Sequence, residues 1–219
     1  MNVGSAGVGK SQTVLQSLSR LSRNFISCLF NFTAWTSAAF VSTIVESKLE
    51  KKNKKRFVPP NGRNLVSTID DVDMPKLEEY GAQPPIELLR QLLNEHGWYR
   101  NQTFASIDST VLVCNLTVSE RVQLSHRFLR KFVAIGISDF SEKELVSIFS
   151  SIVSQSYASI DQSLKSLIDS VVRSSVKVYK EMKAVMLPTP KTLHYSFTSR
   201  DLYRLFEGMC LAKADDLDS

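Results

Sequence analysis

The stretch GSAGVGKS, residues 4–11, decides the fold class of this chain. It matches the pattern G-x-x-x-x-G-K-[ST] of a phosphate-binding loop, which joins a buried strand to a helix. The glycines let backbone amides curl around phosphate oxygens, while Lys10 supplies positive charge and Ser11 a hydroxyl for Mg²⁺. The alternative is a chance glycine turn. It is disfavoured because residues 11–22 place apolar side chains at helical spacing.

Beyond the loop, apolar segments that suit buried strands alternate with segments of helical periodicity. We expect strands at 25–33, 64–71, 109–115 and 132–137, and helices at 11–22, 36–52, 84–97 and 124–132. From residue 141 onward only helical spacing recurs, at 141–156, 160–186 and 198–212. This pattern predicts a doubly wound, mostly parallel α/β sheet over residues 1–138, followed by an all-helical lid over 139–219.

The composition suits one or two globular units, because 43% of the 219 residues are hydrophobic and 22% are charged. No apolar run approaches the roughly 20 residues that span a bilayer, so we expect no membrane partner. The three cysteines are too few and too scattered for a disulfide framework. We therefore expect a reducing compartment.

The segment KLEKKNKKR, residues 48–56, contains much of the excess positive charge of a chain whose net charge is +5. One interpretation is a nucleic-acid patch. The other is the solvated end of an amphipathic helix, where cations complement the helix dipole. We favour the helix end, because no aromatic residue lies among the lysines to stack on bases. The expectation is therefore that nucleic acid is not a partner.

Two carboxylates, Asp70 and Asp71, follow the apolar stretch at 64–69. A carboxylate at the end of a neighbouring parallel strand can hold Mg²⁺ through water, and the next can orient the attacking water. An ordinary acidic turn is the alternative, and Ser67 and Thr68 make this strand less apolar than a buried strand usually is. The spacing of about 60 residues from the phosphate-loop pattern favours the metal-linked interpretation.

Further polar side chains are candidates for phosphoryl chemistry. Asn115 ends the next expected strand, where an amide could position the lytic water or contact the γ-phosphate, although a polar strand terminus explains it nearly as well. Arg127, Arg130 and Arg200 could stabilise phosphoryl-transfer charge, whereas a single arginine on a helix is more often a surface residue. The three histidines lie in separate segments without a neighbouring ligand, so we expect none of them to bind metal.

Several stretches together resemble one module of the dynein heavy chain, a large microtubule motor of the AAA+ class. They are FTAWTSAAFVSTIVESKLEKK, IDDVDMP, YGAQPPIELLRQLLNEHGWY, LSHRFLRKF and LPTPKTLHYSFTSRDLYRLFEG. Their order and spacing, over residues 4–212, resemble the third of six AAA+ modules in the axonemal type of dynein. The resemblance implies a P-loop AAA+ sheet with a truncated first strand, so we expect a fragment of a longer chain.

The resemblance also implies roles for named residues. ATP or ADP would be bound by Gly4, Ser5, Ala6, Gly7, Val8, Gly9, Lys10, Ser11, Gln12 and Arg200. Ser11 and Asp70 would hold Mg²⁺, the carboxylate through water, and Asp71 would activate the attacking water. Asn115 would match the polar sensor of the fourth strand. Arg127 would be an arginine finger that reaches the nucleotide of a neighbouring module.

The sequence departs from the family pattern at three places. Asp73 replaces the usual Asn before Met-Pro, and NLTVSER, residues 115–121, lacks the expected glycine and proline. Asp71 is shorter than the Glu of most AAA+ sites, which favours weak water activation. These departures leave the alignment of Asn115 open by about one position, and leave open whether hydrolysis is retained.

As a whole, the resemblance implies an ATP-binding module that contributes to, and regulates, minus-end-directed microtubule movement. The implied partners are neighbouring AAA+ modules of the same chain, and, through the parent complex, microtubules and the dynein intermediate and light chains. The implied location is the cytoplasmic cytoskeleton and the axoneme of cilia or flagella. The alternatives are a non-hydrolysing structural or regulatory ring module and a non-functional truncated fragment. A free-standing P-loop enzyme is disfavoured, because most of the supporting strand is missing and no arginine would be supplied in trans.

Overall fold

The computed structural model describes residues 1–53, 55–100, 102–118, 124–157 and 162–211, with side chains in these ranges except at 162–166. Contacts divide the chain into two compact units, which are described separately. The first contains Met1–Ser5 and Gly9–Ser138, and the second contains Ala6–Val8 and Asp139–Ser219.

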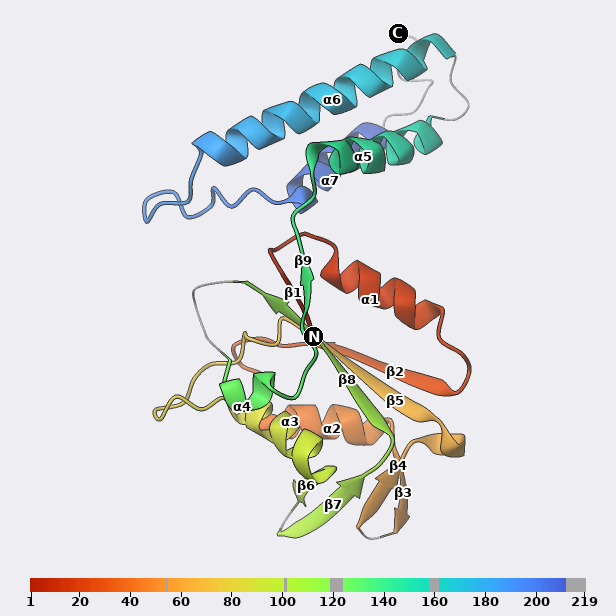
Figure 1. Cartoon of the computed structure of the whole chain (residues 1–219), viewed down its shortest axis with the longest axis vertical. Helices are drawn as coiled ribbons and strands as arrows, with labels where there is room; N and C mark the ends of the chain where they lie inside the picture. Colours follow the sequence, from red (N-terminus) through yellow and green to blue (C-terminus); the bar gives the residue numbers. More distant parts are fainter. Residues whose placement is uncertain (54, 101, 119–123, 158–161, 212–219) are drawn as a thin grey trace. The chain divides into compact units, whose positions relative to one another are not determined.

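The first unit is built on a sheet of five strands in the order β2-β5-β8-β1-β9 (Figure 1). The strands are β1 (Asn2–Gly4), β2 (Phe25–Asn31), β5 (Asn64–Asp70), β8 (Thr110–Thr117) and β9 (Ile135–Ile137). Every neighbouring pair is parallel, which confirms the expected P-loop α/β fold. One face of the sheet carries α1 (Lys10–Ser19); the other carries α2 (Ala38–Ser47), α3 (Pro84–Glu95) and α4 (His126–Leu129).

The core of this unit lies between the sheet and helices α2 to α4. Phe30, Ile69 and Cys114 come from adjacent strands and pack in one cluster with Val45 and Leu89. Burying this apolar surface is the main stabilising contribution, at roughly 25 cal/mol per Å². Strand β5 is buried along nearly its whole length even though it contains two hydroxyl residues. Its central place in the sheet, between β2 and β8, accounts for this burial.

A second, four-stranded sheet was not expected from the sequence. Its order is β3-β4-β7-β6, with β3 (Glu50–Asn53), β4 (Arg56–Val58), β6 (Gly97–Arg100) and β7 (Thr103–Ile107). The expectation of a helix over 36–52 is wrong at its end, because α2 stops at Ser47 and the basic segment forms a β-hairpin. The start of α2 is as expected, since the Ser37 side chain accepts a hydrogen bond from the Phe40 amide and caps the helix.

The expected end of α3 also needs correction. The helix finishes at Glu95, and His96, not Gly97, adopts the left-handed conformation, with φ of 53°. Gly97 instead begins β6, where a Cβ atom would lie 2.2 Å from the carbonyl oxygen of Ala105. The glycine is therefore required by the close approach of two strands.

The two tryptophans of the chain have opposite environments. Trp98 in β6 is 1% exposed, and its indole Nε1 donates a hydrogen bond to Glu46 Oε1 at 3.0 Å. Arg100 donates to the other oxygen of Glu46 at 2.9 Å, so this carboxylate joins α2 to β6. Trp35, in the loop after β2, is 87% exposed, and the ammonium of Lys76 lies 6.0 Å from its ring centroid.

The second unit is helical in its described part, with α5 (Glu142–Ser156), α6 (Gln162–Val185) and α7 (Ser199–Cys210). Its core contains Phe149 and Phe206, whose rings stack with centroids 4.7 Å apart. A capping box at Ser141 and Glu144 begins α5. The helices agree with those expected, and the expected segments at 160–161 and 212 lie outside the described residues. Among described residues, no helix is both long and apolar enough to span a bilayer.

Candidate nucleotide-binding site

The glycine-rich loop connects β1 directly to α1, as a phosphate-binding loop requires. Gly7 and Gly9 have φ of 84° and 82°, a left-handed backbone conformation that glycine adopts without steric cost. Gly9 is the N-cap of α1, and its carbonyl oxygen accepts a hydrogen bond from the Thr13 amide. The amides of the first helical turn therefore point back toward the loop, where an anion is favoured by the helix dipole.

Lys10 is held against the start of this loop. Its side chain is 6% exposed, and its ammonium donates to the carbonyl oxygens of Gly4 at 2.8 Å and Ser5 at 2.6 Å. A buried cation is costly unless it is hydrogen-bonded, and these carbonyls meet part of that need. The result is a positive charge fixed beside the loop, where phosphate oxygens would also be its partners.

Ser11 and Asp70, the two residues predicted to hold a metal, lie in contact in the structure. Ser11 Oγ donates a hydrogen bond to Asp70 Oδ2, although the two residues lie 59 positions apart. Ser11 belongs to the first turn of α1, and Asp70 is the last residue of β5. Hydroxyl and carboxylate oxygens are suitable ligands for Mg²⁺, which usually keeps several waters and needs few protein ligands. Among the described residues, no group of three or more His, Cys, Asp or Glu could hold a metal.

Asp71 lies beside this pair in an unusual backbone conformation, with φ of 52°. Its amide donates to Asp70 Oδ1 at 3.2 Å. Partial burial raises the pKa of Asp71 above its ordinary value of 3.8; the charges of Asp70 and Asp73 raise it further, while Lys10 opposes the shift. A carboxylate with a raised pKa is a better proton acceptor than an ordinary aspartate, so this arrangement suits general-base chemistry.

Asn115 is not at the end of its strand, which corrects the expected boundary. β8 continues to Thr117, while Asn115 is 1% exposed and accepts a hydrogen bond from Asn2 Nδ2 at 2.9 Å. The strand ends instead with the Thr117 hydroxyl, which donates to Asp71 Oδ1 at 3.5 Å. In the parallel register Thr117 pairs with Gly4, the first residue of the loop. Thr117 was not predicted from the sequence, because the expected strand ended two residues earlier, at Asn115.

The remaining predicted site residues do not contact the Ser11–Asp70 pair in any described hydrogen bond or ion pair. Gln12 is exposed in the first turn of α1, and Arg127 is exposed in the short helix α4. Arg200 is exposed in the first turn of α7 and belongs to the second unit. Their roles remain predictions.

Gln83 is a further residue that sequence analysis missed. Its side chain is 5% exposed, and Nε2 donates to the carbonyl oxygens of Asp73 at 3.2 Å and Pro75 at 2.6 Å. These bonds close the loop that follows Asp71. The signal was present in the quoted stretch YGAQPP, where a glutamine immediately precedes the helix α3. Gln83 therefore fixes the segment that presents the second carboxylate of the site.

Comparison with known proteins identifies the family. Residues 1–140 match the family model described as the P-loop containing dynein motor region. The chain belongs to this dynein motor family. It is 36% identical over 212 residues to dynein axonemal heavy chain 6 of Homo sapiens, an alignment that covers 94% of this chain and 5% of the relative.

Other relatives of the dynein family give the same result. The chain is 34% identical to dynein axonemal heavy chain 1 of Homo sapiens, with 96% of this chain and 5% of the relative covered. It is 36% identical to dynein axonemal heavy chain 12 of Mus musculus, with 99% of this chain and 7% of the relative covered. The chain thus spans a small part of the length of these dynein heavy chains, and the expected resemblance to a dynein heavy chain is confirmed.

Proposed function

We propose that the chain is an ATP-binding AAA+ module of an axonemal dynein heavy chain. The single observation that most supports this proposal is the hydrogen bond from Ser11 to Asp70 at the base of the phosphate loop. It brings together two residues, far apart in sequence, that would form the metal-binding part of the proposed site. The names of the relatives support the axonemal type.

Different residues of the loop would contact different parts of the nucleotide. Backbone amides at the start of α1 donate to the phosphate oxygens, and the Lys10 ammonium neutralises part of their charge. The hydroxyl of Ser11 and, through water, the carboxylate of Asp70 would hold Mg²⁺, which would supply additional charge neutralisation. Asp71 accepts a proton from the attacking water. Asn115 remains the proposed polar sensor, although its amide is bonded to Asn2.

The wider role is inferred from the family resemblance. We place the module third in a ring of six, where its nucleotide state regulates microtubule movement driven elsewhere in the ring. Arg127 acts on the nucleotide of a neighbouring module, and Arg200 acts on the nucleotide of this one. The partners are the neighbouring modules and, through the parent complex, intermediate and light chains and microtubules. The location is the axoneme of a cilium or flagellum.

One observation favours a second candidate, a module that binds nucleotide without hydrolysing it. Asp71, with its short side chain, sits in a left-handed backbone conformation and is linked by hydrogen bonds to Asp70 and Thr117. This arrangement limits how far its carboxylate reaches toward an attacking water. Nucleotide would then act as a structural ligand of the ring.

A titration with fluorescent ATP tests the binding function. We expect Lys10→Ala to weaken affinity at least tenfold, whereas the matched variant Lys131→Ala, at an exposed lysine of the same unit, binds like the wild type. Equal affinity of the wild type and Lys10→Ala would overturn the proposal. Phosphate release by a motor ring that contains the module, with Asp71→Asn as comparison, then separates hydrolysis from binding alone.

A further inference from the structure

The net charge of the chain is concentrated in one short segment. The whole chain has 27 basic and 22 acidic residues, a net charge of +5. Residues 48–56 contain six basic residues and one acid, so they also sum to +5. The rest of the chain therefore has 21 basic and 21 acidic residues and is balanced. The positive charge is thus a local property of this segment.

In the structure this segment is largely a β-hairpin at the edge of the second sheet. β3 is the terminal strand in the order β3-β4-β7-β6, and it pairs only with β4 among the described strands. All four residues of β3 are exposed, and the pairing shifts register between Lys51 and Asn53. No other described strand pairs with the outer edge of β3, which therefore offers backbone amides and carbonyls beside lysine side chains.

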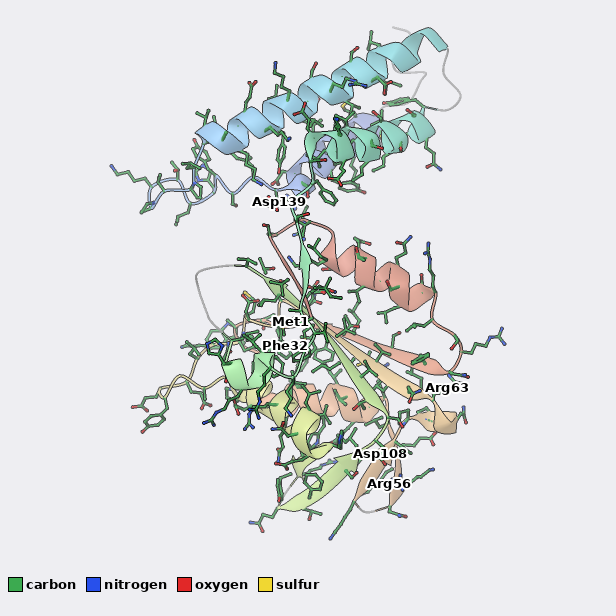
Figure 2. All side chains as sticks on the ribbon, viewed as in Figure 1. Met1, Phe32, Arg56, Arg63, Asp108 and Asp139 are labelled. Atoms are coloured by element: carbon green, nitrogen blue, oxygen red, sulfur yellow. The ribbon has the colours of Figure 1, made fainter. Side chains whose placement is uncertain are left out.

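Little of this charge is neutralised within the described part of the chain. Arg56 forms an ion pair with Asp108 at 2.6 Å, and Figure 2 shows the two residues at the same end of the first unit. No ion pair of Lys51, Lys52 or Lys55 occurs among the described residues, and all three side chains are exposed. Lysine side chains on an exposed edge strand protect it from aggregation. A concentration of lysines as high as this one also creates a local positive potential that attracts an anionic partner.

We propose that the β3–β4 hairpin docks an acidic polypeptide segment, which adds to the outer edge of β3 in an extended conformation. Charge complementarity selects the partner, because Lys51, Lys52 and Lys55 would face its carboxylates. The free backbone groups of β3 favour a peptide strand. A nucleic acid is a poorer fit, because the only aromatic side chain of the hairpin, Phe57, is 6% exposed and offers no stacking surface.

Fluorescence anisotropy with the 219-residue chain tests this inference. The probe is a labelled ten-residue peptide of alternating Glu and Thr, measured at low and at near-physiological salt. We expect the triple variant K51E/K52E/K55E to weaken peptide affinity at least tenfold. The matched triple variant K143E/K177E/K191E makes the same charge change at three exposed lysines of the helical unit, and should weaken it less than threefold.

Further measurements test whether the peptide pairs as a strand, and whether the loss of affinity comes from misfolding of the variant. A peptide with alternate backbone amides methylated should bind at least fivefold more weakly, because it cannot complete a strand pair. The milder variant K51Q/K52Q/K55Q should give an intermediate affinity and an unchanged circular dichroism spectrum. Equal losses in both triple variants, no detectable peptide binding at low salt, or tighter binding of a single-stranded oligonucleotide at the hairpin would each overturn the inference.

Discussion

Ser11 and Asp70 are joined by a hydrogen bond that connects the first turn of α1 to the last residue of β5. β5 and β1 are not neighbours in the sheet, because β8 lies between them. The contact is therefore made above the carboxyl edge of the sheet, where ligands of open α/β folds bind. It depends on both the register of the strands and the start of the helix.

Removing either partner of this pair should weaken Mg²⁺-dependent nucleotide binding. We expect Ser11→Ala and Asp70→Asn each to raise the Kd for ATP at least tenfold in Mg²⁺, because the first removes a hydroxyl ligand and the second removes the carboxylate charge that holds the ion through water. In EDTA the variants should differ little from the wild type. Ser17→Ala is the control, since the Ser17 hydroxyl lies in the same helix and donates to Thr13 O. A Mg²⁺ dependence that survives both changes would contradict this assignment.

Gly97→Ala should destabilise the first unit. The added Cβ would lie 2.2 Å from Ala105 O, and the strands must separate to accept it. We expect a loss of about 1–3 kcal/mol in the free energy of unfolding, measured by urea denaturation. Gly136→Ala in β9 is the matched control, because a Cβ there meets no atom within 4 Å. Equal stabilities of the two variants would show that the strand contact is looser than described.

Asp71 should make stability depend on pH. Its pKa in the folded state is raised above the ordinary value of 3.8, so the folded state retains a proton more readily than the unfolded state. The resulting stability is present below pH 3.8 and is lost as pH rises through the raised pKa. Asp71→Asn has no carboxylate to ionise, so its stability does not fall in this way. As pH rises from 3.8 through the raised pKa of Asp71, the variant should therefore become more stable than the wild type. The midpoint of urea unfolding, measured against pH, checks this prediction, with Glu79→Gln at an exposed position as control. Parallel curves for the wild type and Asp71→Asn would refute it.

The three cysteines should differ in reactivity. Burial raises the pKa of the Cys114 thiol to about 12 and also raises that of Cys28, and both side chains are buried. Cys210 is half-buried, so at pH 8 we expect one thiol to react quickly with a disulfide reagent and the other two only after unfolding. Cys210→Ser should abolish the fast phase. A fast phase that persists in this variant would place a core cysteine at the surface.

The sequence predicts the parts of the fold that follow local patterns. The loop at 4–11 matches a pattern whose residue types are fixed by phosphate chemistry, and it correctly indicated the parallel sheet. Asp70 was found because a carboxylate follows an apolar strand. The start of α2 was found to within two residues, because apolar side chains recur at helical spacing from there onward.

The missed features depend on contacts between distant segments. β3 is charged and exposed, so it lacks the alternation that marks a strand, and its pairing with β4 becomes evident only in space. Thr117 extends β8 past a polar residue, which made Asn115 resemble the strand end. The role of Gln83 depends on two carbonyl groups eight and ten residues away. Local periodicity contains none of this information.

Because Trp98 and Trp35 differ in exposure, their fluorescence should report on two different parts of the molecule. An indole shielded from water emits at shorter wavelength than one surrounded by it, so the two rings should contribute separable bands. The blue band would follow the integrity of the second sheet through Trp98, and the red band would follow the loop after β2 through Trp35. Replacing Trp35 with phenylalanine would leave Trp98 as the single tryptophan, so that indole emission monitors β6 alone.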